Sequence, residues 1–113
     1  MAREKTIKIG RGEAVTIPFS AYTTDTGSTS LDLAGRTVTF TVAQQRDSAT
    51  KVIAETTATV TNAAGGLFEV ALTASATNVS PGMYFWDVWI TSTGYERQLG
   101  YGTFIVRSAA RLP

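Results

Sequence analysis

Side chains that could do acid–base, nucleophilic or metal chemistry are few in this chain of 113 residues. The sequence has no histidine and no cysteine. It therefore lacks the usual general base near neutral pH, the commonest transition-metal ligand and a thiol nucleophile. Serine and threonine are plentiful, but a serine–lysine pair would need Lys5, Lys8 or Lys51 to be buried, and their flanking residues do not predict burial.

The acidic residues are scattered along the chain. They are Glu4, Glu13, Asp25, Asp32, Asp47, Glu55, Glu69, Asp87 and Glu96. Two could meet in space as a glycosidase pair, but no spacing indicates this. The tripeptide Asp25-Thr26-Gly27 resembles the catalytic motif of aspartic proteases, although in a threonine-rich loop it is more typical of a turn. We therefore expect no enzyme activity, no cofactor and no metal site.

The overall charge gives little hint of a partner. The formal net charge is +1, and charged residues make up 17% of the chain. Such a balance provides no general attraction for nucleic acid or anionic lipid, so neither is expected as a partner. The first residues contain no apolar run of the kind found in signal peptides, and no later stretch reaches membrane-spanning length. We therefore expect no signal peptide and no membrane partner.

The strongest structural pattern lies in residues 83–91, after a Pro81-Gly82 turn. Both tryptophans fall here, and the residues alternate with a period of two, which predicts a central β-strand. The predicted inward-facing residues are Tyr84, Trp86, Val88 and Ile90, and the outward-facing ones are Phe85, Asp87, Trp89 and Thr91.

The same reasoning predicts about seven strands in all. The others are residues 14–22, 37–42, 51–55, 58–61, 67–72 and 95–107, with an edge strand considered at 6–9 and a short helix or 3₁₀ turn at 73–79. Pro18 predicts an edge position or a bulge for its strand. A two-residue loop at Thr93-Gly94 predicts that the last two strands pair Val88 with Leu99, Trp86 with Tyr101 and Phe85 with Gly102. Gly100 and Gly102 also predict a bulge, which would turn Phe104 and Val106 inward. Such short strands separated by regular turn signals are typical of a Greek-key β-sandwich.

Several segments resemble a known family. Residues 31–42 (LDLAGRTVTFTV), 66–73, 79–88 and 102–106 are similar, in the same order, to immunoglobulin-like domains of tailed-phage structural proteins, including the N-terminal domain of baseplate upper proteins. The step Gly82-Met83-Tyr84 resembles the tyrosine corner of such sandwiches. The resemblance implies an all-β, immunoglobulin-like Greek-key β-sandwich over residues 13–107, with an arm at 1–12 and a tail at 108–113. It also implies a non-enzymatic tail, baseplate or head-decoration protein of the virion, assembled in the host cytoplasm with other phage structural proteins.

Two regions are candidates for protein contact. Phe85 and Trp89 form an apolar patch if their strand face is exposed, although a loop or the N-terminal segment could cover it. The basic N-terminal segment either docks on a partner, which would allow a homo-oligomer, or is a solvated terminus. The candidate interface residues are Arg3, Lys5, Lys8, Phe85, Trp89, Tyr95 and Arg97. The alternative function is a carbohydrate- or receptor-binding module that uses Phe85, Trp89, Tyr95 and Tyr101.

Overall fold

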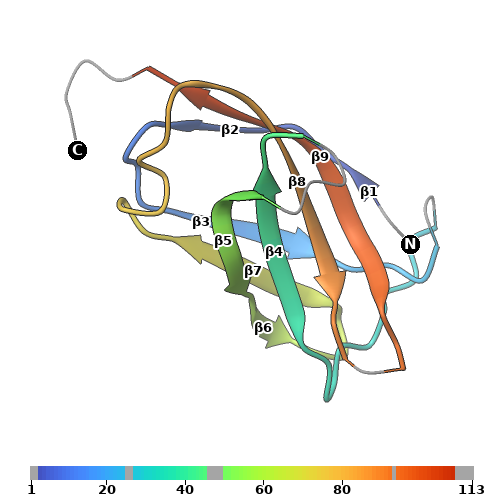
Figure 1. Cartoon of the computed structure of the whole chain (residues 1–113). Coiled ribbons are helices and arrows are strands. Elements are labelled where there is room, and N and C mark those ends of the chain that lie inside the picture. Colours follow the sequence, from blue (N-terminus) through green and yellow to red (C-terminus); the bar gives the residue numbers. More distant parts are fainter. Residues whose placement is uncertain (1–2, 25–26, 46–49, 93, 109–113) are drawn as a thin grey trace.

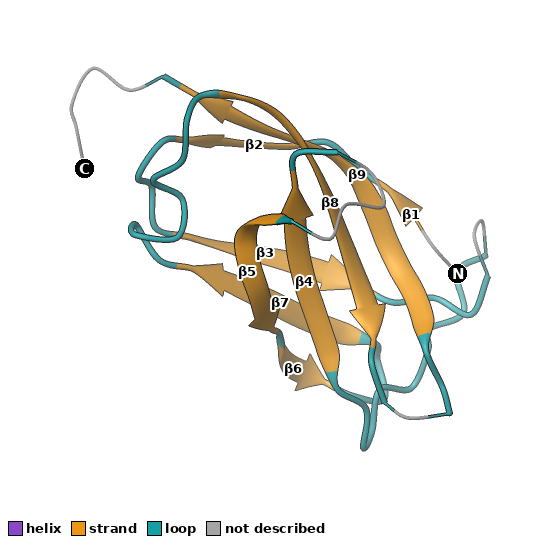
Figure 2. Cartoon of the chain, in the orientation of Figure 1, coloured by secondary structure: helices purple, strands orange, loops and turns teal. Residues whose placement is uncertain are grey.

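Two β-sheets pack face to face in the computed structural model, which describes residues 3–24, 27–45, 50–92 and 94–108 (Figure 1). All regular elements in these residues are strands, joined by loops and turns (Figure 2). The strands are β1 (Arg3–Glu4), β2 (Ile7–Gly10), β3 (Val15–Ser20), β4 (Val38–Ala43), β5 (Lys51–Thr57), β6 (Thr59–Asn62), β7 (Leu67–Leu72), β8 (Gly82–Ile90) and β9 (Arg97–Arg107). The predicted all-β sandwich is confirmed, with nine strands in the described residues instead of about seven because the N-terminal segment adds β1 and β2.

The larger sheet has six strands in the order β1-β9-β8-β4-β5, with β2 also on β9. Both β1 and β2 run parallel to β9, which is 11 residues long and accommodates them one after the other. The smaller sheet has the order β3-β7-β6. The chain passes from the larger to the smaller sheet at Ala58, whose N–H donates to the carbonyl of Val38 at 2.8 Å. The weak strands predicted on either side of this point therefore belong to different sheets.

Strand β3 lies at the edge of the smaller sheet, as Pro18 predicted. Among the described strands it pairs with β7 alone, and Pro18 lies opposite Glu69. The ladder continues past the strand with the N–H of Ala21 donating to the carbonyl of Gly66 at 2.7 Å. Since hydrogen-bonding direction alternates along a strand, the odd-numbered residues bond to β7 and Pro18 directs its missing donor to the free edge.

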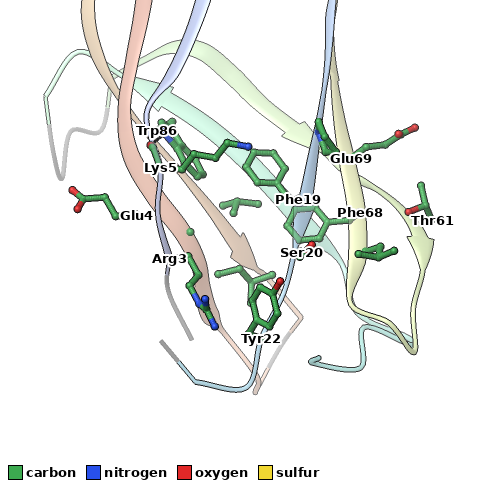
Figure 3. Close-up of a pocket in the computed structure, with 15 residues that line it drawn as sticks. Arg3, Glu4, Lys5, Phe19, Ser20, Tyr22, Thr61, Phe68, Glu69 and Trp86 are labelled. Carbon is green, nitrogen blue, oxygen red and sulfur yellow. Dashed lines mark hydrogen bonds between the residues drawn. The ribbon is translucent and has the colours of Figure 1, made fainter. Parts of the chain in front are cut away.

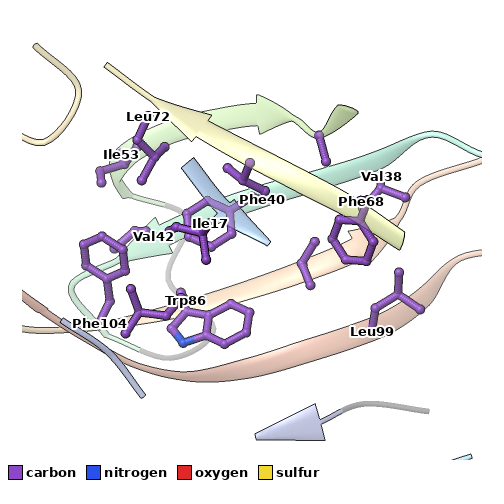
Figure 4. Packing of buried hydrophobic residues seen from close by; sticks show 14 of the residues in the cluster. Ile17, Val38, Phe40, Val42, Ile53, Phe68, Leu72, Trp86, Leu99 and Phe104 are labelled. Atoms are coloured by element: carbon purple, nitrogen blue, oxygen red, sulfur yellow. The ribbon is translucent and has the colours of Figure 1, made fainter. Parts of the chain in front are cut away.

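The core fills the space between the sheets (Figure 4). All four side chains of β8 that were predicted to face inward are buried, with relative exposures of 8% for Tyr84, 3% for Trp86, 1% for Val88 and 0% for Ile90. The Trp86 ring lies 5.8 Å from that of Phe40 on β4 and 5.4 Å from that of Phe19 on β3. Trp86 therefore links the two sheets.

The predicted pairing of β8 with β9 is wrong by one residue beyond the loop, whereas the predicted bulge in β9, with Phe104 and Val106 turned inward, is confirmed. Close to the connecting loop, Ile90 lies opposite Arg97, but beyond a bulge Val88 lies opposite Gly100 and Trp86 opposite Gly102. The bulge leaves both Leu99 and Gly100 buried. A Cβ at Gly100 would lie 3.1 Å from the Trp86 ring, so the aromatic side chain that covers a cross-strand glycine is Trp86 and not Phe85.

The N-terminal segment is part of the sandwich. Ile7 and Ile9 are 6% and 2% exposed, so they belong to the core, and the expectation of a solvated terminus does not hold. Of the predicted edge strand at 6–9, residues 7–9 lie in β2. The predicted tail, 108–113, lies outside the described residues except for Ser108.

The helix or 3₁₀ turn predicted at 73–79 is a hydrogen-bonded turn. The hydroxyl of Thr73 accepts a hydrogen bond from the N–H of Ala76 at 3.1 Å, as an N-cap would. The buried hydroxyl of Thr77 donates to the carbonyl of Glu13 at 2.8 Å, which ties the turn to the start of β3. This hydrogen bond anchors the segment, which forms one turn and no longer helix.

Candidate interaction surface

The outward side of the larger sheet carries an apolar surface. Alternation along β8 places Met83, Phe85 and Trp89 on this side, because Tyr84, Trp86 and Val88 face the core. The register of β9 adds Ile105 opposite Met83 and places Tyr101 opposite Asp87. We call these five residues, Met83, Phe85, Trp89, Tyr101 and Ile105, the outer face.

Two side chains of the outer face are strongly exposed. Met83 is 62% exposed and Trp89 is 38% exposed, and the third large apolar side chain exposed among the described residues, Leu67, lies on β7 of the other sheet. Phe85, Tyr101 and Ile105 are partly buried by their neighbours. The N-terminal segment extends the edge of the sheet beside β9 and does not cross this face.

Asp87 holds the Trp89 ring in place. One carboxylate oxygen accepts a hydrogen bond from the Thr41 hydroxyl at 2.8 Å, and the other accepts one from the Trp89 indole N–H at 2.9 Å. Both oxygens of Asp87 therefore accept hydrogen bonds within the chain, and one of these bonds fixes the orientation of the Trp89 ring. A ring fixed before binding loses less conformational entropy on binding, as expected of an anchor residue.

Lys8 borders the outer face. It lies opposite Ile105, and its neighbours Ile7 and Ile9 point into the core, so its exposed side chain is on the outward side of the sheet. The structure thus places Lys8, Phe85 and Trp89 of the predicted interface on one side of the molecule.

Tyr95 and Arg97 lie elsewhere. Arg97 is opposite the inward-facing Ile90, and Tyr95 packs against the edge of the core. The Tyr95 ring lies 3.9 Å from the guanidinium carbon of Arg36 and 4.7 Å from that of Arg97. These three side chains form a separate cation–π stack at one end of the sandwich and do not extend the outer face.

Arg3 and Lys5 line a groove at one side of the sandwich. Across this groove, which has a volume of about 580 Å³, Lys5 points toward Phe19 of β3 and Arg3 toward Tyr22, just after β3 (Figure 3). The guanidinium carbon of Arg3 lies 4.1 Å from the Tyr22 ring centre, and the Arg3 side chain donates to the carbonyl of Gly27. The Lys5 ammonium lies 5.4 Å from the Phe19 ring centre. Both cations therefore interact with aromatic rings of this chain.

The groove offers little open aromatic surface. The Phe19 ring stacks on Phe68 at 5.2 Å and also lies below Lys5, while Arg3 covers Tyr22. Sugar binding by stacking needs an uncovered ring face, and these contacts cover parts of the Phe19 and Tyr22 rings. The side chains that line the groove therefore pack against one another at the edge of the sandwich.

Sequence reasoning missed Met83 and Ile105. Met83 was predicted only as the start of the central strand, and the residue beside it on β9 depends on the register. The alternation in residues 103–107 does predict an outward Ile105, but only the bulge at Leu99 places it opposite Met83.

Two specific features can be checked over the described part of the chain. No group of three or more acidic residues there is arranged to hold a metal ion, and none of its segments forms an apolar helix long enough to cross a membrane. Asp25, Thr26 and Asp47 lie outside the described residues, as does Thr93. Neither family models nor curated proteins give a match to this chain.

Proposed function

We propose that this chain is a non-enzymatic structural protein of a bacteriophage virion, with an immunoglobulin-like sandwich that docks on other virion proteins through its outer face. The observation that carries the proposal is the exposure of Met83 (62%) and Trp89 (38%) on a sheet whose opposite side forms the core. Large aromatic and methionine side chains are enriched at protein interfaces, where burial of their apolar surface drives association.

The strand order supports the immunoglobulin-like assignment. In that fold one sheet contains strands B, E and D, and the other contains G, F, C and, in variable-type domains, C′. The sheets β3-β7-β6 and β9-β8-β4-β5 follow these two orders when β3 is taken as strand B and β9 as strand G. The Tyr84 hydroxyl donates to the carbonyl of Ser80, which matches the tyrosine corner at the start of strand F.

The composition of the outer face also favours a protein partner. Its five residues are apolar or aromatic, and the nearest charged group on β8, Asp87, is already hydrogen-bonded within the chain. Lys8 lies at the border, so the surface has an apolar centre and a charged side chain at its rim. This arrangement is common in protein–protein interfaces.

The carbohydrate-binding alternative has less support. It requires Phe85, Trp89, Tyr95 and Tyr101 to act together, but the Tyr95 ring contacts Arg36 and Arg97 at the end of the sandwich. The remaining rings lie on the outer face, where Asp87 is the carboxylate beside them and is engaged on both oxygens.

The proposal is tested by incorporation into phage particles. Tagged chain would be supplied during phage growth, and mass spectrometry would measure its copy number in purified particles. A double variant, Met83→Ser and Trp89→Ser, removes the apolar centre, and Leu67→Ser removes a similarly exposed apolar side chain (41%) from the other sheet as a control. Circular dichroism would establish that each variant is folded.

We expect the native chain and Leu67→Ser to be incorporated and the double variant to be reduced by about tenfold or more. Absence of the native chain from particles would refute the virion role. Equal incorporation of all three would show that another surface docks. Binding to a glycan array that Trp89→Ser abolishes would favour the carbohydrate-binding alternative.

A further inference from the structure

The outer edge of the larger sheet is formed by the N-terminal segment. β1 and β2 follow β9 along its length, and no strand in the described residues pairs with their other side (Figure 1). The register is the same before and after the short interruption between them, with Glu4 opposite Tyr101 and Ile7 opposite Phe104. No residue is inserted, so the alternation of side chains and hydrogen-bonding groups continues from residue 3 to residue 10.

The hydrogen bonds show which residues face the open edge. The N–H of Lys5 donates to the carbonyl of Tyr101 at 3.0 Å, and the N–H of Arg11 donates to that of Arg107 at 3.0 Å. Odd-numbered residues thus bond to β9, and alternate residues direct their groups to the opposite side. The backbone N–H and C=O groups of Glu4, Thr6 and Lys8 therefore point away from the sheet.

The side chains of these three residues are exposed, and they share the outward side of the sheet. An antiparallel copy of the same segment, centred on Thr6, places Glu4 opposite Lys8 of the second copy and Lys8 opposite its Glu4. Thr6 then lies opposite itself on a two-fold axis. All three pairs join residues whose backbone groups face the edge, as hydrogen-bonded antiparallel pairs require.

We propose that a second copy of this chain pairs with this edge through residues 4–8 and joins the two six-stranded sheets into one continuous sheet. Opposite charges directly across two strands stabilise the pair, as does a threonine–threonine pair. The segment is therefore complementary to itself in charge and in hydrogen bonding, which is what a two-fold interface demands. Lys8 still discourages partners that present a cation, since like charges directly opposite are destabilising.

The free edge of β3 is less suited to the same use. Pro18 directs its missing N–H to that edge, so the middle of β3 offers no donor there. Pairing at residues 4–8 also places the outer faces of both copies on the same side of the joined sheet, because the axis is perpendicular to it. The pairing uses the edge alone and does not depend on the proposed virion role.

Cysteine cross-linking tests the register. The chain has no cysteine, so Thr6→Cys and Lys8→Cys each carry a single thiol. Centred pairing places the two Thr6 Cα atoms about 5.5 Å apart, within the range for a disulfide. The two Lys8 residues would be separated by about 13 Å along the strands. Under mild oxidation we expect Thr6→Cys to form a disulfide-linked dimer and Lys8→Cys to remain largely monomeric. Equal cross-linking of both, or none for Thr6→Cys, would overturn the proposal.

Charge exchange tests the attraction without any covalent bond. We expect the native chain to dimerise in sedimentation equilibrium, and Lys8→Glu to weaken the dimer by about tenfold or more, because it converts two attractive pairs into repulsive ones. The double variant Glu4→Lys and Lys8→Glu has the same composition as the native chain and should restore the dimer. A monomeric native chain, or a double variant as weak as the single one, would contradict the pairing. No phage component enters either assay, so its failure is distinct from failure of the proposed function.

Discussion

Replacement of Trp86 by alanine tests the central feature of the fold. The indole is 3% exposed, and its ring lies within 6 Å of two rings from different strands, 5.4 Å from Phe19 and 5.8 Å from Phe40. Its N–H donates to the carbonyl of Lys5 at 2.9 Å, so it also holds the N-terminal segment. Deletion of a buried aromatic side chain of this size costs about 3–5 kcal/mol. This is a large share of the roughly 5–15 kcal/mol that stabilises a typical domain.

A smaller change at the same position keeps part of the packing. Trp86→Phe keeps an aromatic ring and removes the donor to Lys5, so we expect it to cost about 1–3 kcal/mol. Trp89→Ala removes the same type of side chain from the outer face and should cost no more than about 1 kcal/mol. The free energies of unfolding would be measured by urea denaturation followed by far-ultraviolet circular dichroism, because the variants change the tryptophan fluorescence.

The ranking of these variants decides whether the inward and outward sides of β8 are assigned correctly. A loss below about 1 kcal/mol for Trp86→Ala together with a larger loss for Trp89→Ala would mean that the two sides are reversed, as a one-residue slip of the strand would produce. Equal losses for the two variants would also contradict the assignment. A loss of the expected size only for Trp86→Ala supports the assignment.

Three further predictions use the same denaturation assay. Gly102→Ala should cost about 1–3 kcal/mol, because a Cβ there would lie 2.0 Å from the carbonyl oxygen of Lys5; unchanged stability would mean that the N-terminal segment is not held against β9. Tyr84→Phe removes the donor to the carbonyl of Ser80 and should cost about 1 kcal/mol. Unchanged stability would show that this hydrogen bond does not stabilise the fold. Ile9→Ala should cost about 2–5 kcal/mol because Ile9 is 2% exposed, whereas a solvated arm would show a change within about 0.5 kcal/mol.

The N-terminal segment also affects how oligomerisation can be studied. Deletion of residues 1–12 would remove Ile7 and Ile9 from the core and expose β9 as a new edge. Loss of stability and edge-to-edge aggregation would then obscure any change in oligomeric state. Single exposed substitutions at Thr6 and Lys8 avoid this problem.

The pairing of β8 with β9 could be predicted from the sequence only close to the loop. Residues close to the loop pair as a short hairpin predicts, with Ile90 opposite Arg97, because turn geometry acts over a few residues. Farther along, the bulge at Leu99 shifts the register by one. It brings Gly102 below the backbone of Lys5, where no side chain fits. The glycines at 100 and 102 do predict a bulge in this strand, but the close contact of Gly102 with Lys5, almost a hundred positions earlier, cannot be read from the hairpin sequence.

The residues of the candidate interaction surface could likewise be predicted only in part. Phe85 and Trp89 could be placed together from the sequence, since each is two strand positions from Asp87 and on the same side of the strand. Tyr95 and Arg97 are close to them in sequence, but the loop turns them toward Arg36, which the chain brings from far away. Met83 and Ile105 meet only through the pairing of β8 with β9.

The sequence by itself determined the class of fold and the direction of side chains along each strand, because alternation with a period of two is a local property of the backbone. It also limited the available chemistry, since a chain without histidine or cysteine has few reactive groups. Only the tertiary structure decided that the N-terminal segment is an edge strand, that Asp87 fixes the Trp89 ring, and that Arg3 and Lys5 cover aromatic rings within the chain. These features depend on contacts between residues distant in sequence, and each contact forms only when the whole sandwich brings its two partners together.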